Sequence, residues 1–226
     1  MPRLRLSPTL LAILVVSLFL AGCGGGDEED SEPREPFSPQ ATLTAIGGTK
    51  RTDKPEVVLR VKTRPGDTNI RSAAVTLPPV FVVEQAALGN LCSERELEAN
   101  DCAGRKRLGV ARVVSPTYSE ALTGPVYPVS GSGGLPRLAY LLGEGPAGIV
   151  LRGRIAIRGV RIEAGVDDVP DVPMDTFELS ITGGDPGYLI LNQDICRREA
   201  IANASFTSQS GEAFERRIPL EADCDA

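Results

Sequence analysis

The chain has 226 residues and a formal net charge of −6, from 30 acidic and 24 basic side chains. An acidic protein lacks the basic face that nucleic-acid phosphates require, so we expect no nucleic-acid partner. Histidine is absent, which excludes Ser-His-Asp and Cys-His catalysis and removes the most common zinc ligand. Tryptophan is also absent and aromatic residues make up only 4%, which disfavours a pocket built on aromatic platforms. We therefore expect a protein that is not an enzyme and uses no cofactor.

The N-terminal segment has the layout of a secretory signal. Arg3 and Arg5 supply positive charge, an apolar run covers residues 10–20, and small residues follow it. The run matches a signal core of roughly 7–15 residues and is shorter than the roughly 20 apolar residues of a spanning helix. An ordinary signal cut near Gly22 would leave Cys23 as an unpaired thiol in an exported protein.

The end of this segment, Leu20-Ala21-Gly22-Cys23, resembles the lipobox of bacterial lipoproteins. In that family the cysteine thiol receives a lipid and the preceding peptide bond is cut. The resemblance implies that residues 1–22 are a lipoprotein signal peptide. It also implies that acylated Cys23 anchors the protein in the lipid bilayer, at the extracytoplasmic face of the cell membrane. A single acyl chain binds only marginally, so the diacylglyceryl group expected there supplies the two chains of a stable anchor.

A lipidated, disordered tether rich in acidic residues and proline is predicted over residues 23–40. Phe37 is its only large apolar residue, so the segment cannot bury enough surface to offset the entropy of ordering. We interpret the acidic run at residues 27–30 as a solvated spacer rather than a cation site.

From Ala41 onward the chain alternates apolar and polar residues over short stretches separated by glycine and proline turns. The expected strands cover residues 41–46, 56–62, 69–77, 108–114, 124–129, 137–142, 149–158, 160–164, 176–182, 202–208 and 213–220. Ser93 and Glu96 have the spacing of a capping box and predict one short helix. The pattern predicts an all-β domain over residues 41–226, an antiparallel β-sandwich with one domain or two packed sub-lobes.

Four cysteines follow the tether, and an even count in an exported chain predicts two disulfides. They are Cys92, Cys102, Cys196 and Cys224. Three connectivities are possible, and we favour the sequence-local pairs, Cys92 with Cys102 and Cys196 with Cys224. A zinc site made of all four cysteines is the alternative, but it usually needs close CxxC pairs, which this chain lacks.

A second resemblance covers residues 55–226. The stretch LCSERELEANDCAGRKRLGVARVVSP, the stretch FELSITGGDPGYLILNQDIC and the hairpin that ends near Cys224 carry it. Together they look like one copy of an uncharacterised disulfide-stapled β-module of predicted exported proteins from GC-rich bacteria. That family implies no activity, and it supports the β fold and the favoured disulfide pairing.

Two groups of charged residues are candidate binding sites. The loop DDVPDVPMD holds four aspartates that form a weak calcium candidate, Asp167, Asp168, Asp171 and Asp175. The loop lacks EF-hand spacing, and its prolines equally fit a rigid connector. Arg152, Arg154 and Arg158 share one face of a predicted strand, where they form either a basic stripe for an acidic envelope polymer or an ordinary solvated face. No other metal site and no catalytic residue is expected.

The leading hypothesis is a non-catalytic β-domain that binds or displays something in the cell envelope, with an envelope polymer or a protein as its partner. One alternative is a substrate-binding lipoprotein of a transporter, a class that usually has two lobes of alternating strands and helices. The other is a hydrolase that uses carboxylates alone, which needs two acidic groups within about 10 Å of each other in a cleft.

Overall fold

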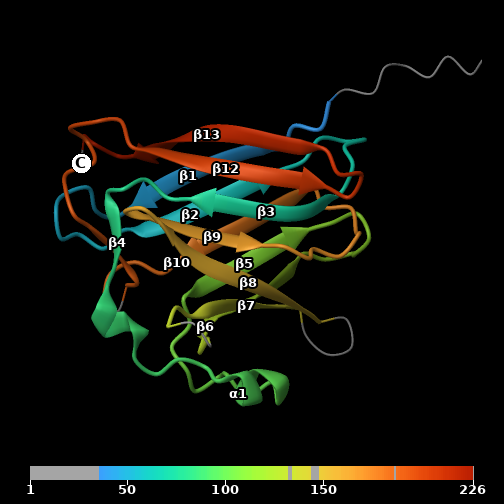
Figure 1. Cartoon of the computed structure of the whole chain (residues 1–226), viewed down its shortest axis with the longest axis horizontal. Coiled ribbons are helices and arrows are strands. Elements are labelled where there is room, and N and C mark those ends of the chain that lie inside the picture. Colours follow the sequence, from blue (N-terminus) through green and yellow to red (C-terminus); the bar gives the residue numbers. More distant parts are fainter. Residues whose placement is uncertain (1–35, 132–133, 144–147, 186, 226) are drawn as a thin grey trace, which may run out of the picture. The chain divides into compact units, whose positions relative to one another are not determined.

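In a computed structural model of the chain, eleven strands of the described residues close into one barrel (Figure 1). The structure describes residues 36–131, 134–143, 148–185 and 187–225. The predicted signal peptide, Cys23 and the tether as far as residue 35 lie outside the described residues. Among the residues that are described, no helix is long and apolar enough to cross a membrane.

The barrel strands follow the sequence pattern closely. They are β1 (Gln40–Ile46), β2 (Glu56–Lys62), β3 (Ile70–Thr76), β5 (Gly109–Val114), β6 (Leu122–Val129), β7 (Arg137–Leu142), β8 (Ile149–Arg158), β9 (Arg161–Val166), β10 (Thr176–Ile181), β12 (Ile201–Ser208) and β13 (Ala213–Ala222). Around the barrel the order is β1-β13-β12-β3-β9-β8-β7-β6-β5-β10-β2, and β2 pairs with β1 to close the ring. Only the β1–β13 pair of the described barrel is parallel.

The predicted β-sandwich is wrong, although the all-β class is correct. A sandwich of two open sheets has edge strands, whereas β1 pairs with β13 on one side and with β2 on the other. Leu43, for example, lies opposite both Leu220 and Leu59. Alternation within a strand shows which of its faces is buried but does not name its neighbours. The sequence pattern therefore did not distinguish two packed sheets from one closed sheet.

On strands such as β2, alternation correctly separates the inside of the barrel from the outside. Val57 and Val61 of β2 are buried in the barrel, and Arg60 between them is exposed. The interior side chains form two apolar clusters, one centred on residues such as Phe206 and the other around Tyr140. Several partly buried side chains, including Phe177, contact both clusters.

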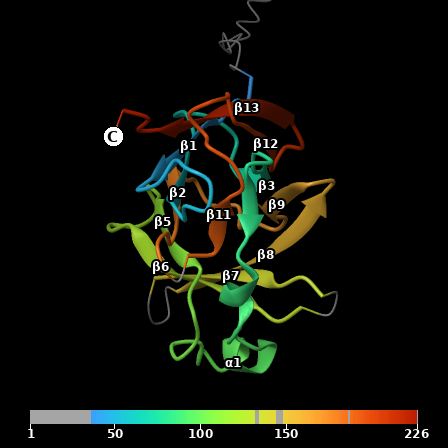
Figure 2. The same cartoon turned by 90° about the vertical axis from the view of Figure 1, so that its left-hand side faces the viewer.

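Two short strands that the sequence analysis missed lie across one end of the barrel (Figure 2). They are β4 (Phe81–Val83), which the 3-10 helix η1 (Gln85–Leu88) follows, and β11 (Leu189–Leu191). Phe81 and Leu191 are 0% and 1% exposed and belong to the same cluster as the barrel wall. Strands of three residues are too short to show periodicity, so only their contacts reveal them.

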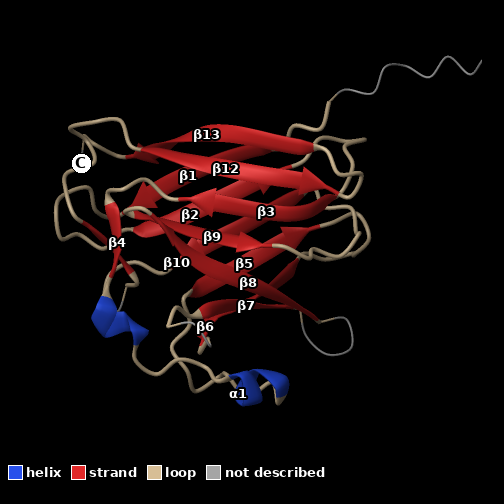
Figure 3. Ribbon diagram, in the orientation of Figure 1, coloured by secondary structure: helices blue, strands red, loops and turns tan. Residues whose placement is uncertain are grey.

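The short helix α1 (Glu94–Glu98) forms as the capping box predicts (Figure 3). The Ser93 hydroxyl accepts a hydrogen bond from the Glu96 N–H at 3.2 Å, and the Glu96 carboxylate accepts one from the Ser93 N–H at 2.8 Å. The Arg105 guanidinium, together with these Ser93 groups, lowers the pKa of Glu96 to about 2. Five residues would not stay helical alone, so the loop around them provides the necessary support.

Both disulfides have the favoured pairing, Cys92 with Cys102 and Cys196 with Cys224. The first holds the α1 loop against the outer face of the barrel, where a third apolar cluster forms around Leu97. The backbone of Cys92 also bonds to β6, since its N–H donates to the Pro128 carbonyl at 3.1 Å. The second disulfide joins the segment before β12 to the segment after β13.

The folded unit begins before Ala41. Phe37 is 5% exposed and packs in the same apolar cluster as Leu43, and Pro39 is fully buried. The division of the chain into compact units falls before residue 35. The one large apolar residue of the predicted tether is thus part of the domain, because the barrel offers it a surface to bury against.

Removing the disulfides tests their part in the stability of the barrel. Replacing Cys92 and Cys102 with alanine should lower the free energy of unfolding by about 2.7 kcal/mol, and replacing Cys196 and Cys224 by about 3.6 kcal/mol, since the second bond closes the longer loop. Urea unfolding of the two double variants and the wild type measures both losses. Equal losses, or the reverse order, would contradict the loop-length argument.

Candidate functional site

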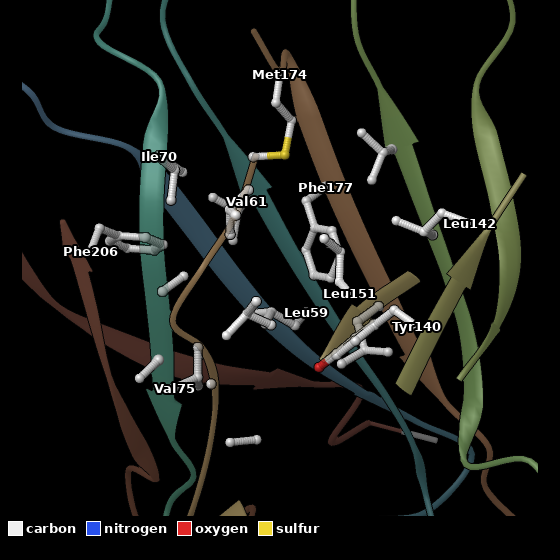
Figure 4. Close-up of a pocket in the computed structure, with 18 of the residues that line it drawn as sticks. Leu59, Val61, Ile70, Val75, Tyr140, Leu142, Leu151, Met174, Phe177 and Phe206 are labelled. Carbon is white, nitrogen blue, oxygen red and sulfur yellow. The ribbon is translucent and has the colours of Figure 1, made fainter. Parts of the chain in front are cut away.

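A cavity of about 160 Å³ lies inside the barrel (Figure 4). Its walls include side chains from both interior clusters, such as Val75 and Phe206 of one and Tyr140 and Leu142 of the other. No charged residue occurs in the described lining, whose only side-chain hydroxyls are those of Ser115, Tyr118 and Tyr140. An apolar cavity of about 150 Å³ stays dry and binds a molecule the size of benzene, so this space is large enough for a ligand.

The number of strands explains why a cavity remains. The interior of a barrel of roughly eight strands is about filled by its own side chains, and the diameter grows with the number of strands. This barrel has eleven strands in its described part, and several wall positions hold small residues such as Ala73 and Ala164. The β4–β11 pair fills one end of the wider interior, and the remaining space is the cavity.

The loop between β9 and β10, residues 167–175, covers the other end of the barrel and is called here the cap loop. Its apolar residues line the cavity, namely Val169, Pro170, Val172, Pro173 and Met174. The Thr63 hydroxyl donates a hydrogen bond to the Met174 carbonyl. On the opposite side, the Gln209 side chain donates to the Val169 carbonyl at 3.0 Å. The cap loop is therefore tied to two neighbouring loops.

The cap loop is the segment that holds the calcium candidate. Asp167 pairs with Arg154 at 2.9 Å, and Asp171 accepts a hydrogen bond from Asn69 at 2.7 Å. No group of three or more acidic, histidine or cysteine side chains able to hold a metal occurs within the described residues. The aspartates Asp167, Asp168, Asp171 and Asp175 do not converge, and the apolar residues between them face the cavity. The valines and prolines between the aspartates are the sequence signal for a cap, because they are the apolar residues of this acidic loop.

Tyr140 brings a polar group into a strand of the cavity wall. It lies on β7, is 3% exposed, and directs its hydroxyl oxygen into the cavity (Figure 4). Its ring packs edge-on against Phe177, with 6.2 Å between the ring centroids. Burial raises the pKa of the Tyr140 phenol above its ordinary value, so the group is uncharged at neutral pH. Within the described residues this hydroxyl has no hydrogen-bond partner.

The arginine stripe on β8 is paired with acidic residues. Arg152 contacts Glu94 at 2.7 Å, and Arg154 and Arg158 contact Glu163 at 3.1 and 3.3 Å. These pairs lie on the outer face of the barrel and neutralise most of the positive charge of the stripe. An acidic polymer would have to displace these carboxylates, so the stripe is a weak candidate for such a partner.

The described structure lacks the features expected for a transporter substrate-binding protein or for a hydrolase that uses carboxylates alone. The described residues form a barrel and not two lobes of alternating strands and helices around a cleft. None of the described residues that line the cavity is Asp or Glu, so the cavity has no pair of carboxylates for hydrolysis.

Comparisons with known proteins do not assign a family. No protein-family model and no curated protein matches the chain. Among solved structures, the major pilin subunit of Bacillus cereus is 10% identical over 82% of this chain and 40% of its own, with a TM-score of 0.36. A DUF4466 family protein from Parabacteroides merdae is 10% identical over 82% of this chain and 44% of its own, with a TM-score of 0.33. A cohesin module from a Clostridium perfringens family 33 glycoside hydrolase is 9% identical over 83% and 99%, with a TM-score of 0.29.

The present chain therefore spans less than half the length of the first two structures. These likenesses are too distant to support an argument about function. The candidate site stands on the geometry of the cavity alone.

Substitution of Gly153 tests how tightly the wall is packed beside Tyr140. A Cβ at Gly153 would lie 3.0 Å from the Tyr140 ring and 3.0 Å from the Gly165 carbonyl. Gly153→Ala should therefore lower the free energy of unfolding by about 1–3 kcal/mol through overpacking. Gly104→Ala is the control, because a Cβ there meets nothing within 4 Å, and it should be neutral or slightly stabilising. If urea unfolding gave the same free energy for Gly153→Ala and Gly104→Ala, the wall beside Tyr140 would not be tightly packed.

Proposed function

We propose that this protein is a non-catalytic, membrane-anchored β-barrel of the cell envelope that binds a small apolar molecule in its interior. The cavity carries this proposal, because its described walls are aliphatic and aromatic with three hydroxyls and no charge. The scarcity of aromatic residues does not oppose it, since aliphatic side chains form most of the lining. The ligand would be held by burial of apolar surface rather than by stacking on aromatic platforms.

The expected affinity for a small probe follows from the surface that it buries. A benzene-sized molecule has roughly 200 Å² of apolar surface, and its removal from water is worth about 25 cal/mol per Å². The resulting free energy of about 5 kcal/mol corresponds to a Kd of roughly 0.2 mM. A natural ligand that reaches further along the cap loop would bind more tightly, because it would bury more surface.

The position at which the N-terminal segment enters the barrel favours a ligand that comes from the membrane. Gln40, where β1 begins, pairs with Lys62, and Lys62 also pairs with Thr176, which directly follows the cap loop. Arg64 donates a hydrogen bond to the Pro36 carbonyl at this same end. Residues 36–40 thus enter the barrel at the capped end of the cavity.

The length of the tether limits how far that end can move from the bilayer. Phe37 lies fourteen positions after Cys23, a stretch that spans at most about 50 Å when fully extended. An acylated Cys23 would therefore keep the capped end of the cavity within that distance of the lipid headgroups. Apolar molecules of the bilayer would be its closest source of ligand.

Filling the cavity tests the proposed binding. Benzene added to the wild-type protein should shift the methyl resonances of wall residues such as Leu59 and Leu151, with saturation near the Kd estimated above. Ala164→Phe places a ring at an inward position of β9 and should abolish the shifts. Ala156→Phe is the matched control, because position 156 on β8 does not line the cavity, and it should bind as the wild type does. Unchanged spectra of the wild type, or equal binding by both variants, would refute the proposal.

The proposed anchor is tested independently of the ligand. Wild-type protein from native-host membranes should have the mass of residues 23–226 plus a diacylglyceryl-based lipid, less the four hydrogens lost to two disulfides. Cys23→Ser should lack the added lipid mass, because the thiol that would receive the lipid is gone. A wild-type protein with an unmodified Cys23, or a Cys23→Ser variant that still carries the lipid mass, would contradict the anchor.

A further inference from the structure

Tyr140 differs from the other buried tyrosine of the barrel interior in what its hydroxyl contacts. Tyr188 donates its hydroxyl hydrogen to the Lys106 carbonyl at 3.1 Å. The Tyr140 hydroxyl faces the cavity and has no such acceptor among the described residues. Every fully buried side-chain polar atom of the described residues has a hydrogen-bond partner, so the unpaired Tyr140 hydroxyl is one that a molecule in the cavity can reach.

The surroundings of Tyr140 offer no substitute partner. Its neighbours across the strands are Val126 and Leu151, and its ring packs on Phe177. The Ser115 hydroxyl is already used near the cap loop, where it accepts a hydrogen bond from the Thr117 N–H at 3.1 Å. The Tyr118 hydroxyl also lines the cavity, but Ser115 and Tyr118 follow the end of β5, whereas Tyr140 is in register with Gly109 at its start. A molecule deep in the cavity would therefore meet the Tyr140 hydroxyl as a donor in an otherwise apolar part of the wall.

Given the proposed function, on which this inference rests, we propose that Tyr140 selects the ligand by donating a hydrogen bond to a single uncharged oxygen acceptor. The expected ligand is an apolar molecule that carries one ketone, ester or ether group, whose oxygen accepts the hydrogen bond. A hydrocarbon without such an oxygen would fill the space but leave the phenol unpaired.

The chemistry of the wall restricts the class to neutral acceptors. The described neighbours of Tyr140 are apolar, so an alcohol that accepts from it would leave its own hydrogen without a partner there, whereas a carbonyl or ether oxygen needs only one donor. A carboxylate would lose its hydration in a cavity that has no cation in its described lining, which is strongly unfavourable. Because burial keeps the phenol protonated, Tyr140 serves as a donor throughout the neutral pH range.

Two probes of nearly equal shape test the inference. Cyclohexanone carries a carbonyl oxygen where methylenecyclohexane carries a CH₂ group, so the pair differs mainly in the acceptor. The ratio of their Kd values is measured by methyl NMR titration for the wild type, for Tyr140→Phe and for Tyr188→Phe. Tyr140→Phe should weaken cyclohexanone relative to methylenecyclohexane by about 2- to 12-fold, the usual net worth of one hydrogen bond. Tyr188→Phe removes a buried hydroxyl outside the cavity and should leave the ratio unchanged.

The outcomes separate this inference from the proposed function. If methylenecyclohexane binds to the wild type and Tyr140→Phe leaves the ratio unchanged, Tyr140 does not select the ligand, although the cavity still binds apolar molecules. If neither probe binds to the wild type, the proposed function itself fails.

A spectroscopic measurement keeps the inference testable if Tyr140→Phe does not fold. The carbonyl stretch of ¹³C-labelled cyclohexanone bound to the wild type should lie at a lower frequency than in cyclohexane solution, because the bound carbonyl accepts a hydrogen bond. A frequency equal to that in cyclohexane would overturn the inference.

Discussion

Closure of the sheet through β1 is the constraint on which the rest of the structure depends. β1 pairs in parallel with β13 and antiparallel with β2, so the first and last strands of the described residues meet in one ring of strands. Once eleven strands of the described chain form that ring, its diameter exceeds what the wall side chains fill. The interior must then contain additional protein, a ligand or empty space. The β4–β11 pair, the cap loop and the cavity each follow from that requirement.

The two ends of the barrel meet the requirement in different ways. At one end Phe81 and Leu191 are fully buried and join the wall cluster, so that end has the packing of an ordinary core. At the other end the cap loop contributes proline and valine side chains and is tied by the Thr63 hydroxyl and the Gln209 side chain. The Asn69 and Arg154 side chains and backbone hydrogen bonds such as that from the Val169 N–H to the Arg71 carbonyl also hold the cap loop. A strand pair therefore closes one end of the barrel and a tied loop closes the other.

The charged side chains of β8 lie on the outer face of the barrel, away from the cavity. The arginines of β8 are paired with Glu94 and Glu163 on the outer face, and the described lining holds no ionisable acid or base apart from phenols. A low-dielectric interior of this kind favours neutral ligands and strengthens any single hydrogen bond made within it. One phenol in such an environment is enough to distinguish ligands by the presence of an oxygen atom.

The sequence by itself determined the local features of this protein. Period-two alternation placed most of the strands and their buried faces, the Ser93–Glu96 spacing placed α1, and the cysteine count with its sequence-local preference led to the correct disulfide pairs. These features depend on residues that are close in the chain, so a linear pattern contains them.

Only the tertiary structure decided the features that depend on distant residues. The pairing of β1 with β13, the burial of Phe37, the inward direction of the Tyr140 hydroxyl and the position of the cap loop over the cavity all join segments far apart in sequence. A strand's pattern is the same in a sandwich and in a barrel, because both bury one face. Which neighbours a strand takes, and so whether a cavity exists, is settled only when the sheet closes.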